Sequence, residues 1–353
     1  MKIISQPRKL DTFYVYLSLF FIFFILSLGL GYATLNRYDP GTIIGFADFR
    51  YYAEIVKNGP TFFTDEQIGI KTRLLAPWIG HLAYNIIPNI GTYNAVSVAM
   101  LIVNSAFTSL SVVFIINLTY RFLDDIDVAL ISGFIFFTNF FITNSYLAGS
   151  VDAAYGCMFL LMFYIIINDK WVLLPAMMII GCLTKEVFLP VGSAIILCIL
   201  VQITLANGYL PWKKFLLALT TVLTGSATII ILNYLVYGAI SSPWELLPTD
   251  NVNIEQFIFD LRDVIKSISI NVFRFFLILG MITLGAIYSL RYFPQWFIAG
   301  NLGALIMTVS LAIHLTVVGE LSGADYARFM FSPMALLLSG ACAVTLSKLK
   351  NHI

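Results

Sequence analysis

Long apolar segments recur along the chain and are separated by short polar ones. A segment of about 20 apolar residues is long enough to cross the ~30 Å hydrocarbon core of a bilayer as an α-helix. Residues 74–88 are shorter, and are read as a re-entrant or interfacial helix or as the start of a span. The pattern predicts an all-α, polytopic transmembrane helical bundle of about ten spans. The expected spans are 13–35, 92–117, 128–147, 153–168, 171–183, 187–206, 215–240, 268–290, 293–317 and 328–347.

The composition agrees with this pattern. Soluble proteins have roughly 25% charged residues, whereas this chain has 11% charged residues, 59% hydrophobic residues and a mean hydropathy of +0.90. No segment is long and polar enough to form a separate soluble domain, so residues 1–353 are read as a single transmembrane domain. The net charge of +1 gives no case for a nucleic-acid partner.

Motifs for metal or nucleotide chemistry are missing from the sequence. The four cysteines lie in apolar segments without C-x-x-C spacing, so we predict small buried side chains and neither a disulfide nor a metal site. No Walker loop, Rossmann fingerprint, Ser-His-Asp pattern or H-E-x-x-H motif occurs. We therefore expect no cytoplasmic nucleotide site.

Basic residues set the expected orientation in the membrane. Lys2, Arg8 and Lys9 precede the first span and place the N-terminus in the cytoplasm, because short cytoplasmic loops carry an excess of Lys and Arg. With alternating spans, Lys348 and Lys350 place the C-terminus there too. Every unusually polar loop then falls outside, which predicts a site at the outer membrane boundary. These loops are 36–73, 148–152, 184–186, 241–267 and 318–327.

The first outer loop, 36–73, contains a helical pattern. Asp48, Tyr51, Tyr52 and Ile55 are spaced i, i+3, i+4, i+7 and share one helical face. We expect a short interfacial helix that turns Asp48 and the two tyrosines inward. A carboxylate in that position can accept a proton from an attacking hydroxyl. The alternative is that Asp48 is an N-terminal cap or a first-turn acid favoured by the helix dipole.

Basic side chains follow this helix. Lys71 and Arg73 precede the next apolar segment, where two cations could hold a phosphate or diphosphate. The alternative is snorkelling by residues that flank a membrane helix. His81 lies two turns further along the same face and is a weaker candidate, because a lone histidine is more often a packing residue.

Three charged residues lie near mid-chain spans. Asp152 begins a span and is read either as a helix cap or as a second carboxylate facing the same cavity. Lys185 and Glu186 interrupt an apolar segment. They form either an exposed outer turn or a recessed pair, and recessed charges are costly unless they are paired or functional.

The last two outer loops supply further candidates. Asp325 and Arg328 are spaced i, i+3 at the entry to the final span. They form either a local ion pair or a binding site in which Arg328 holds a lipid-linked phosphate and Asp325 orients it. Loop 241–267 contains an amphipathic stretch, 254–265, which we expect to be an interfacial helix over the outer mouth.

These motifs together resemble the GT-C superfamily of polytopic glycosyltransferases, which use sugars linked to lipid phosphates. The likeness rests on D-x-x-Y-Y from Asp48, R-L-L-A-P from Arg73, T-K-E from Thr184 and D-x-x-R from Asp325. It covers nearly the whole chain by topology, but each motif is short. The chain departs from many members in having a single acid at Asp48 rather than two adjacent ones, and in lacking a C-terminal soluble domain.

The resemblance implies an inverting sugar transfer on the outer face. It implies that Asp48 is the general base and that Arg73, Arg328 and Lys185 bind the polyprenyl phosphate. Further candidates are the substrate-binding residues Lys71, Tyr51, Tyr52 and His81 and the supporting acids Asp152, Glu186 and Asp325. The donor would be a polyprenyl-phosphate sugar and the acceptor a glycan, lipid or protein. No cofactor is implied, and dependence on a divalent metal stays open.

The expected location is a bacterial or archaeal cytoplasmic membrane, with both termini in the cytoplasm and the active face outside. Two other functions stay open: a transporter or flippase for a lipid-linked or anionic solute, and a non-catalytic membrane assembly subunit. A transporter is expected to show internal repeats with broken helices near the midplane, and the sequence shows no repeat.

Overall fold

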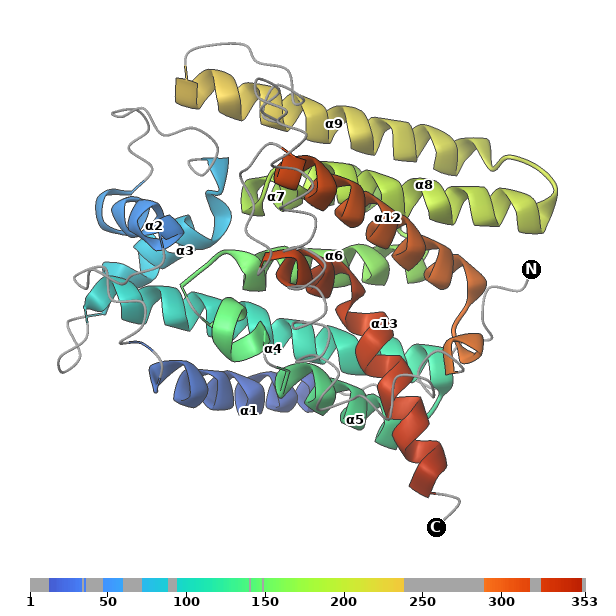
Figure 1. The fold of residues 1–353 in the computed structure, drawn as a ribbon, viewed down its shortest axis with the longest axis horizontal. Coiled ribbons are helices and arrows are strands. Elements are labelled where there is room, and N and C mark those ends of the chain that lie inside the picture. The colour runs from blue at the N-terminus through green and yellow to red at the C-terminus, as the bar shows by residue number, and fades with distance from the viewer. Residues whose placement is uncertain are drawn as a thin grey trace.

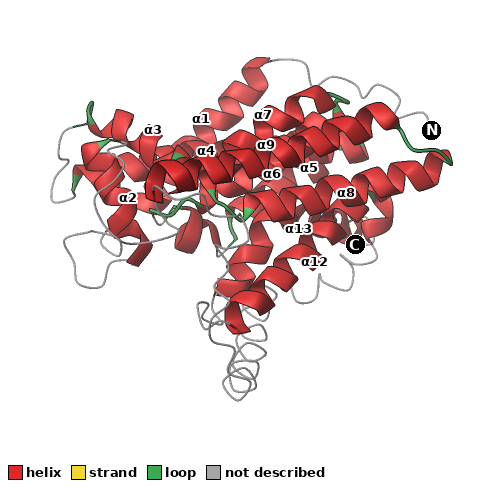
Figure 2. Ribbon diagram, turned by 90° about the horizontal axis from the view of Figure 1, so that it is seen from above, coloured by secondary structure: helices red, strands yellow, loops and turns green. Residues whose placement is uncertain are grey.

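In the computed structural model, the described residues form helices that are joined by turns and loops. The structure describes residues 13–33, 35, 47–59, 72–87, 94–139, 141–147, 149–237, 289–317 and 325–350. Figure 2 shows helices and loops, and no strand, in this part of the chain. The α-helices are α1 (Phe13–Tyr32), α2 (Ala47–Asn58), α3 (Leu75–Tyr84), α4 (Ala95–Leu123), α5 (Ile126–Phe137), α6 (Asp152–Ile167), α7 (Leu174–Thr184), α8 (Phe188–Asn207), α9 (Trp212–Tyr237), α12 (Gln295–Val317) and α13 (Asp325–Lys350). Short helical turns are η3 (Ile142–Tyr146), η4 (Trp171–Leu173) and η5 (Leu290–Tyr292).

Four of the described helices, α1, α4, α8 and α9, are long and apolar enough to cross a membrane. Shorter apolar helices accompany them: 126–137, 152–167, 171–184 and 295–311. Large apolar side chains of α1 and α9, among them Phe21, Ile25, Leu216 and Leu223, are exposed on the protein surface. A surface of this kind suits lipid better than water. The all-α prediction is confirmed and an integral membrane protein is indicated, while the count of about ten spans stays a prediction.

One expected span is wrong in its bounds. Segment 128–147 is not a single helix, because α5 ends at Phe137 and η3 follows after a bend. The Thr138 hydroxyl donates to the Phe134 carbonyl (2.8 Å), and the Asn139 side chain accepts from the backbone N–H of Phe141 (3.0 Å). The Asn139 bond is a local side-chain turn that competes with the next turn of helix.

The open question at 74–88 resolves towards a short helix. α3 has ten residues, which is roughly half the length needed to cross the hydrocarbon core. It packs against α2 and α4. The expected span 268–290 lies almost wholly outside the described residues, and the expected interfacial helix 254–265 lies entirely outside them.

α4 is the central helix of the bundle and packs against α1, α3, α5 and α6. Its ends follow from local sequence. The Asn94 side chain accepts from the N–H of Val96 (3.0 Å) at the start, and Asp124 takes a left-handed conformation (φ 52°) at the end. The Asp125 side chain then caps α5 by accepting from the N–H of Val128 (3.1 Å). The acidic turn between the two helices is thus built from helix caps.

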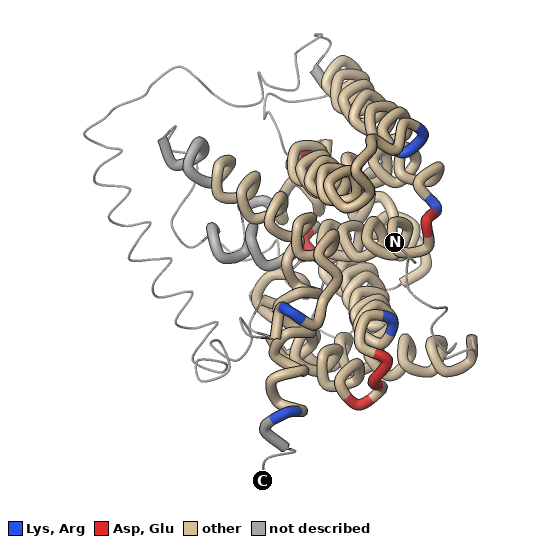
Figure 3. The backbone as a smooth tube through the Cα atoms, turned by 90° about the vertical axis from the view of Figure 1, so that its right-hand side faces the viewer, with Lys and Arg blue, Asp and Glu red and all other residues tan. Residues whose placement is uncertain are grey.

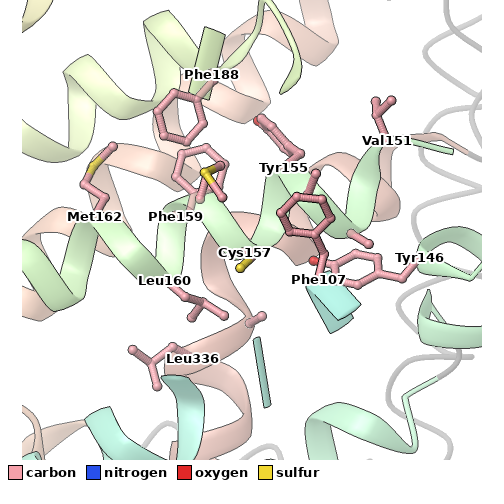
Figure 4. Packing of buried hydrophobic residues seen from close by; sticks show 14 of the residues in the cluster. Phe107, Tyr146, Val151, Tyr155, Cys157, Phe159, Leu160, Met162, Phe188 and Leu336 are labelled. Atoms are coloured by element: carbon pink, nitrogen blue, oxygen red, sulfur yellow. The ribbon is translucent and has the colours of Figure 1, made fainter. Parts of the chain in front are cut away.

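Close helix packing explains how α8 and α12 meet. A side chain at Gly303 of α12 would come within 2.7 Å of the Ala194 carbonyl oxygen of α8. Only glycine permits this approach, as is common where membrane helices pack closely. Elsewhere in the bundle, the buried rings of Phe159 and Phe188 pack together with centroids 4.6 Å apart, and the ring of Phe163 packs against Phe297 of α12 at 4.9 Å. Figure 4 shows Phe159 beside Phe188, with Tyr155 near both.

The bundle has two distinct ends. α2 and α3 lie at the left of Figure 1, where α4 begins, and we call this the α2–α3 end. The α4–α5 and α8–α9 turns lie at the right, and we call this the opposite end. Figure 3 looks at the opposite end and shows charged residues at the turns between helices. There Arg121 donates to the Asn168 side chain (2.7 Å), and Lys214 pairs with Asp169 (2.6 Å).

Candidate functional site

Four charged side chains from three distant segments meet at the α2–α3 end. Arg73 lies just before α3, Asp152 is the first residue of α6, and Lys185 and Glu186 form the turn between α7 and α8. They form two ion pairs, Lys185 with Asp152 and Arg73 with Glu186. The second pair joins residues that are 113 positions apart in the sequence. These four charged residues, each of which was singled out separately in the sequence, thus lie in one cluster.

The Lys185–Asp152 pair is buried. The distance from Nζ to Oδ1 is 3.2 Å, and each side chain is only 2% exposed. The other Asp152 oxygen, Oδ2, accepts from the Ser145 hydroxyl (2.5 Å) and the Ser150 hydroxyl (3.2 Å). Moving charges out of water costs several kcal/mol per ion, and only good geometry with further hydrogen bonds repays it. The two serines supply such bonds to the carboxylate.

The local backbone conformation directs the side chains of Lys185 and Asp152 into the bundle. α7 ends at Thr184, and Lys185 follows in an extended conformation (φ −166°, ψ 132°). On the other side, Gly149 has φ 77°, which allows a tight turn before α6. The Asn104 amide of α4 donates to the Ser150 carbonyl (2.9 Å) and holds this turn against the central helix. Lys185 is therefore recessed, as one of the two sequence interpretations had it.

Arg73 and Glu186 form a bidentate pair nearer the surface. Arg73 Nε lies 2.9 Å from Oε2 and Nη2 lies 2.5 Å from Oε1, with side chains 14% and 18% exposed. Arg73 Nη1 also donates to the Tyr52 hydroxyl (3.2 Å), which ties the site to α2. The guanidinium is thus held in the planar fork geometry that suits carboxylates and phosphates.

The pKa values of this pair reflect their mutual attraction. Burial alone would raise the pKa of Glu186, but the adjacent Arg73 outweighs it and holds the pKa below its ordinary range. Burial would likewise lower the pKa of Arg73, but Glu186 and Tyr52 raise it well above the usual value. Both groups are charged at neutral pH.

α2 brings the predicted base close to this site. A side chain at Gly149 would come within 2.8 Å of the Phe49 ring, so the first turn of α2 lies against the turn that leads to Asp152. Asp48 belongs to that first turn of α2. The backbone of Asp48 is described and helical, and its side chain lies outside the described part. The role of Asp48 as general base stays a prediction.

The remaining candidates lie in different places. His81 Nδ1 is 2.8 Å from the Val56 carbonyl oxygen, so its ring joins α3 to α2. Tyr51 is half-buried on α2. Lys71 falls outside the described residues. Asp325 and Arg328 lie in the first turn of α13, and their side chains are not described.

Several contributors were missed by sequence reasoning. Ser145, Ser150 and Asn104 build the surroundings of Asp152, and small polar residues in apolar segments gave no distinct signal. Tyr155 was also missed. It lies one helical turn after Asp152, and Lys185 Nζ is 5.4 Å from its ring centroid. Its i+3 spacing from Asp152 was the available signal.

Metal ligands do not gather at this site. Across the described part of the chain, no group of three or more His, Cys, Asp or Glu side chains could hold a metal ion. No protein-family model matches the chain, and no curated protein shows a significant sequence match. What the structure establishes is a helical protein with four candidate membrane spans.

Proposed function

We propose that the protein is a membrane-embedded glycosyltransferase of the GT-C type, which moves a sugar from a polyprenyl-phosphate donor to an acceptor on the outer face of the membrane. One observation carries the proposal. Two cations, Arg73 and Lys185, and two acids, Asp152 and Glu186, meet beside the first turn of α2. Charges buried at the end of an apolar helix bundle point to a functional site rather than to a simple connector.

The proposed reaction assigns each group a task. Asp48 accepts the proton of the acceptor hydroxyl, whose oxygen attacks the anomeric carbon of the donor sugar. The bond between that carbon and the phosphate oxygen breaks, and the polyprenyl phosphate leaves with the electron pair. Attack opposite the leaving group inverts the anomeric centre. Arg73, with Lys185 and Arg328 as further candidates, stabilises the negative charge that develops on the phosphate.

The donor chemistry fits a site without a nucleotide-binding motif. A polyprenyl-phosphate sugar is already activated, so catalysis needs a base, cations for the departing phosphate and correct positioning. A transporter would be expected to place its charges near the membrane midplane between two repeated halves. The four charged groups instead lie at helix starts and turns at the α2–α3 end.

A transfer assay with purified protein tests the proposal. The protein in lipid nanodiscs is incubated with radiolabelled polyprenyl-phosphate sugars and an extract of membrane acceptors, and the release of polyprenyl phosphate is measured. We expect Asp48→Asn to lower transfer by about 10²-fold or more. The matched control is Glu54→Gln, an exposed acid on the same helix, which we expect to leave transfer unchanged.

Two outcomes would contradict the proposal. Full activity of Asp48→Asn would remove Asp48 as the base. Movement of the intact donor across a proteoliposome membrane, without cleavage by the wild-type protein, would favour the flippase function.

A further inference from the structure

The Arg73–Glu186 pair uses the same fork of donors that arginine presents to a phosphate. Two parallel N–H donors, Nε and Nη2, bind the two carboxylate oxygens at 2.9 and 2.5 Å. A phosphate offers two oxygens in closely similar positions, and arginine is favoured where such bidentate recognition matters. In the described structure, a carboxylate of the protein itself therefore fills the place that the proposed function gives to a phosphate group.

The Arg73–Glu186 pair can open without disturbing the buried pair beside it. Glu186 is 18% exposed, whereas its neighbour Lys185 is 2% exposed and bound to Asp152. Glu186 lies in a turn between two helices rather than inside one. A rotation of its side chain towards solvent therefore rehydrates the carboxylate and leaves the Lys185–Asp152 pair in place.

A second observation points to a ligand. Tyr155 is 1% exposed, and its hydroxyl has no hydrogen-bond partner within the described part of the chain. An unsatisfied buried hydroxyl costs about 1–3 kcal/mol, so each such group in a native protein calls for an explanation. Lys185 Nζ lies 5.4 Å from the ring centroid of Tyr155, and Tyr155 lies one helical turn after Asp152, so this residue belongs to the same cluster. A donor at this position is available to a negatively charged group that enters the site.

We infer that the Glu186 carboxylate is a displaceable stand-in for a phosphate: a phosphomonoester or phosphodiester exchanges with Glu186 on Arg73 and accepts a hydrogen bond from Tyr155. The inference rests on the proposed function, since it specifies how that site takes the phosphate of its donor. The exchange keeps the Arg73 guanidinium paired before and after binding, so no cation is left desolvated and alone. The carboxylate competes with the ligand, so its removal strengthens phosphate binding.

Binding of a short prenyl phosphate tests the inference. Geranyl phosphate, inorganic phosphate and geraniol are titrated into the full-length protein in detergent, and affinity is measured by calorimetry. We expect Glu186→Gln to bind geranyl phosphate about tenfold more tightly than the wild type, because the competing charge is gone. Unchanged or weaker binding by Glu186→Gln overturns the inference.

Tyr155→Phe provides a test that does not depend on a change at Glu186. We expect this variant to bind geranyl phosphate several-fold more weakly, while its melting temperature does not fall, because the removed hydroxyl has no hydrogen-bond partner among the described residues. The matched control is Tyr146→Phe, whose hydroxyl donates to Ser332 (3.0 Å). We expect that control to lose stability and to keep its affinity. Unchanged affinity of Tyr155→Phe overturns the role of this residue.

The three probes identify the source of the phosphate. Equal effects on inorganic phosphate and geranyl phosphate indicate a free phosphate, and an effect on geranyl phosphate alone indicates a lipid-linked one; both support the exchange. Binding of geraniol as tight as geranyl phosphate overturns phosphate recognition. The transfer assay is separate. Exchange without any sugar transfer refutes the proposed function alone, and transfer without the Glu186→Gln effect refutes the exchange alone.

Discussion

The two ends of the bundle both pair a lysine with an aspartate, but they do so in opposite surroundings. At the α2–α3 end, Lys185 and Asp152 are each 2% exposed and lie 3.2 Å apart. At the opposite end, Lys214 and Asp169 are 21% and 57% exposed and lie 2.6 Å apart. The pair with the shorter distance is not the one on which stability depends more. Water screens the exposed pair and can solvate either charge if the pair breaks, whereas no water solvates the charges of the buried pair.

This difference shows that burial of the Lys185–Asp152 pair costs desolvation free energy at the α2–α3 end. A buried ion pair is weak support for stability, since well-packed apolar residues often do as well or better. Stability alone therefore does not explain the two buried charges and the two serine hydroxyls around the Asp152 carboxylate. We interpret their role as the positioning of the neighbouring Arg73–Glu186 pair, because Lys185 and Glu186 share one turn.

The largest expected effect comes from breaking the buried pair on one side. Lys185→Met leaves the Asp152 carboxylate buried without its lysine, and we expect a loss of about 3–5 kcal/mol in the free energy of unfolding. Thermal and denaturant unfolding in detergent measure it. The double variant Lys185→Met with Asp152→Asn removes both charges and is expected to recover much of the loss. An effect of Lys185→Met no larger than that of Lys214→Met would contradict the comparison.

The next effect concerns activity rather than stability. Arg73→Lys keeps the positive charge but loses the fork that binds two oxygens, so we expect sugar transfer to fall about tenfold or more. The melting temperature should change little by comparison. Lys214→Arg at the opposite end is the matched control and is expected to keep full transfer. Wild-type activity in Arg73→Lys would show that two-point binding by Arg73 is not needed.

A smaller effect appears as a dependence on pH. The folded-state pKa of Glu186 is lowered by Arg73, and an unperturbed glutamate titrates near about 4.3. The stability that this shift supplies is therefore fully present above about pH 4.3 and is lost as the pH falls through the folded-state pKa. We expect the difference in melting temperature between wild type and Glu186→Gln to be constant above about pH 5 and to shrink below about pH 4. A difference that persists at low pH would refute the assignment.

The smallest effect is expected at the opposite end. Lys214→Met removes an exposed partner and should cost between about 0 and 1 kcal/mol in unfolding free energy. The loss should diminish further in high salt, because exposed charges are screened. Melting curves at low and high salt concentration measure this. A loss of the size expected for Lys185→Met would show that exposure does not separate the two pairs.

Much of the helical architecture followed from local sequence. Apolar length predicted the helices that became α1, α4, α8 and α9, because a polypeptide in lipid must satisfy its own backbone hydrogen bonds. The gap between the expected spans 92–117 and 128–147 contains Asp124 and Asp125, which shape the end of α4 and the start of α5. The break after α5 was missed, since the residues around Thr138 and Asn139 continue an apolar run and only their side-chain bonds reveal the turn.

Each of the four charged residues in this cluster was singled out from the sequence, but their pairing was not. Arg73, Asp152, Lys185 and Glu186 each stood out, because charge is rare in so apolar a chain. Nothing local indicates that Lys185 and Glu186, adjacent in sequence, pair with residues of two different segments, Asp152 at the start of α6 and Arg73 before α3. That outcome depends on the extended conformation at Lys185 and on the packing of α6, α7 and α3 around it.

The pattern of residue types was enough to show that this chain is helical, strongly apolar and marked by a few charged residues that need partners. Those properties depend on residue type and near neighbours, which the one-dimensional pattern records. The partner of each charge, the burial of one pair and the unpartnered Tyr155 hydroxyl in the described part became visible only in the packed helices. The physical reason is that pairing energies depend on distance and local dielectric between segments far apart in the chain, and folding alone brings those segments together.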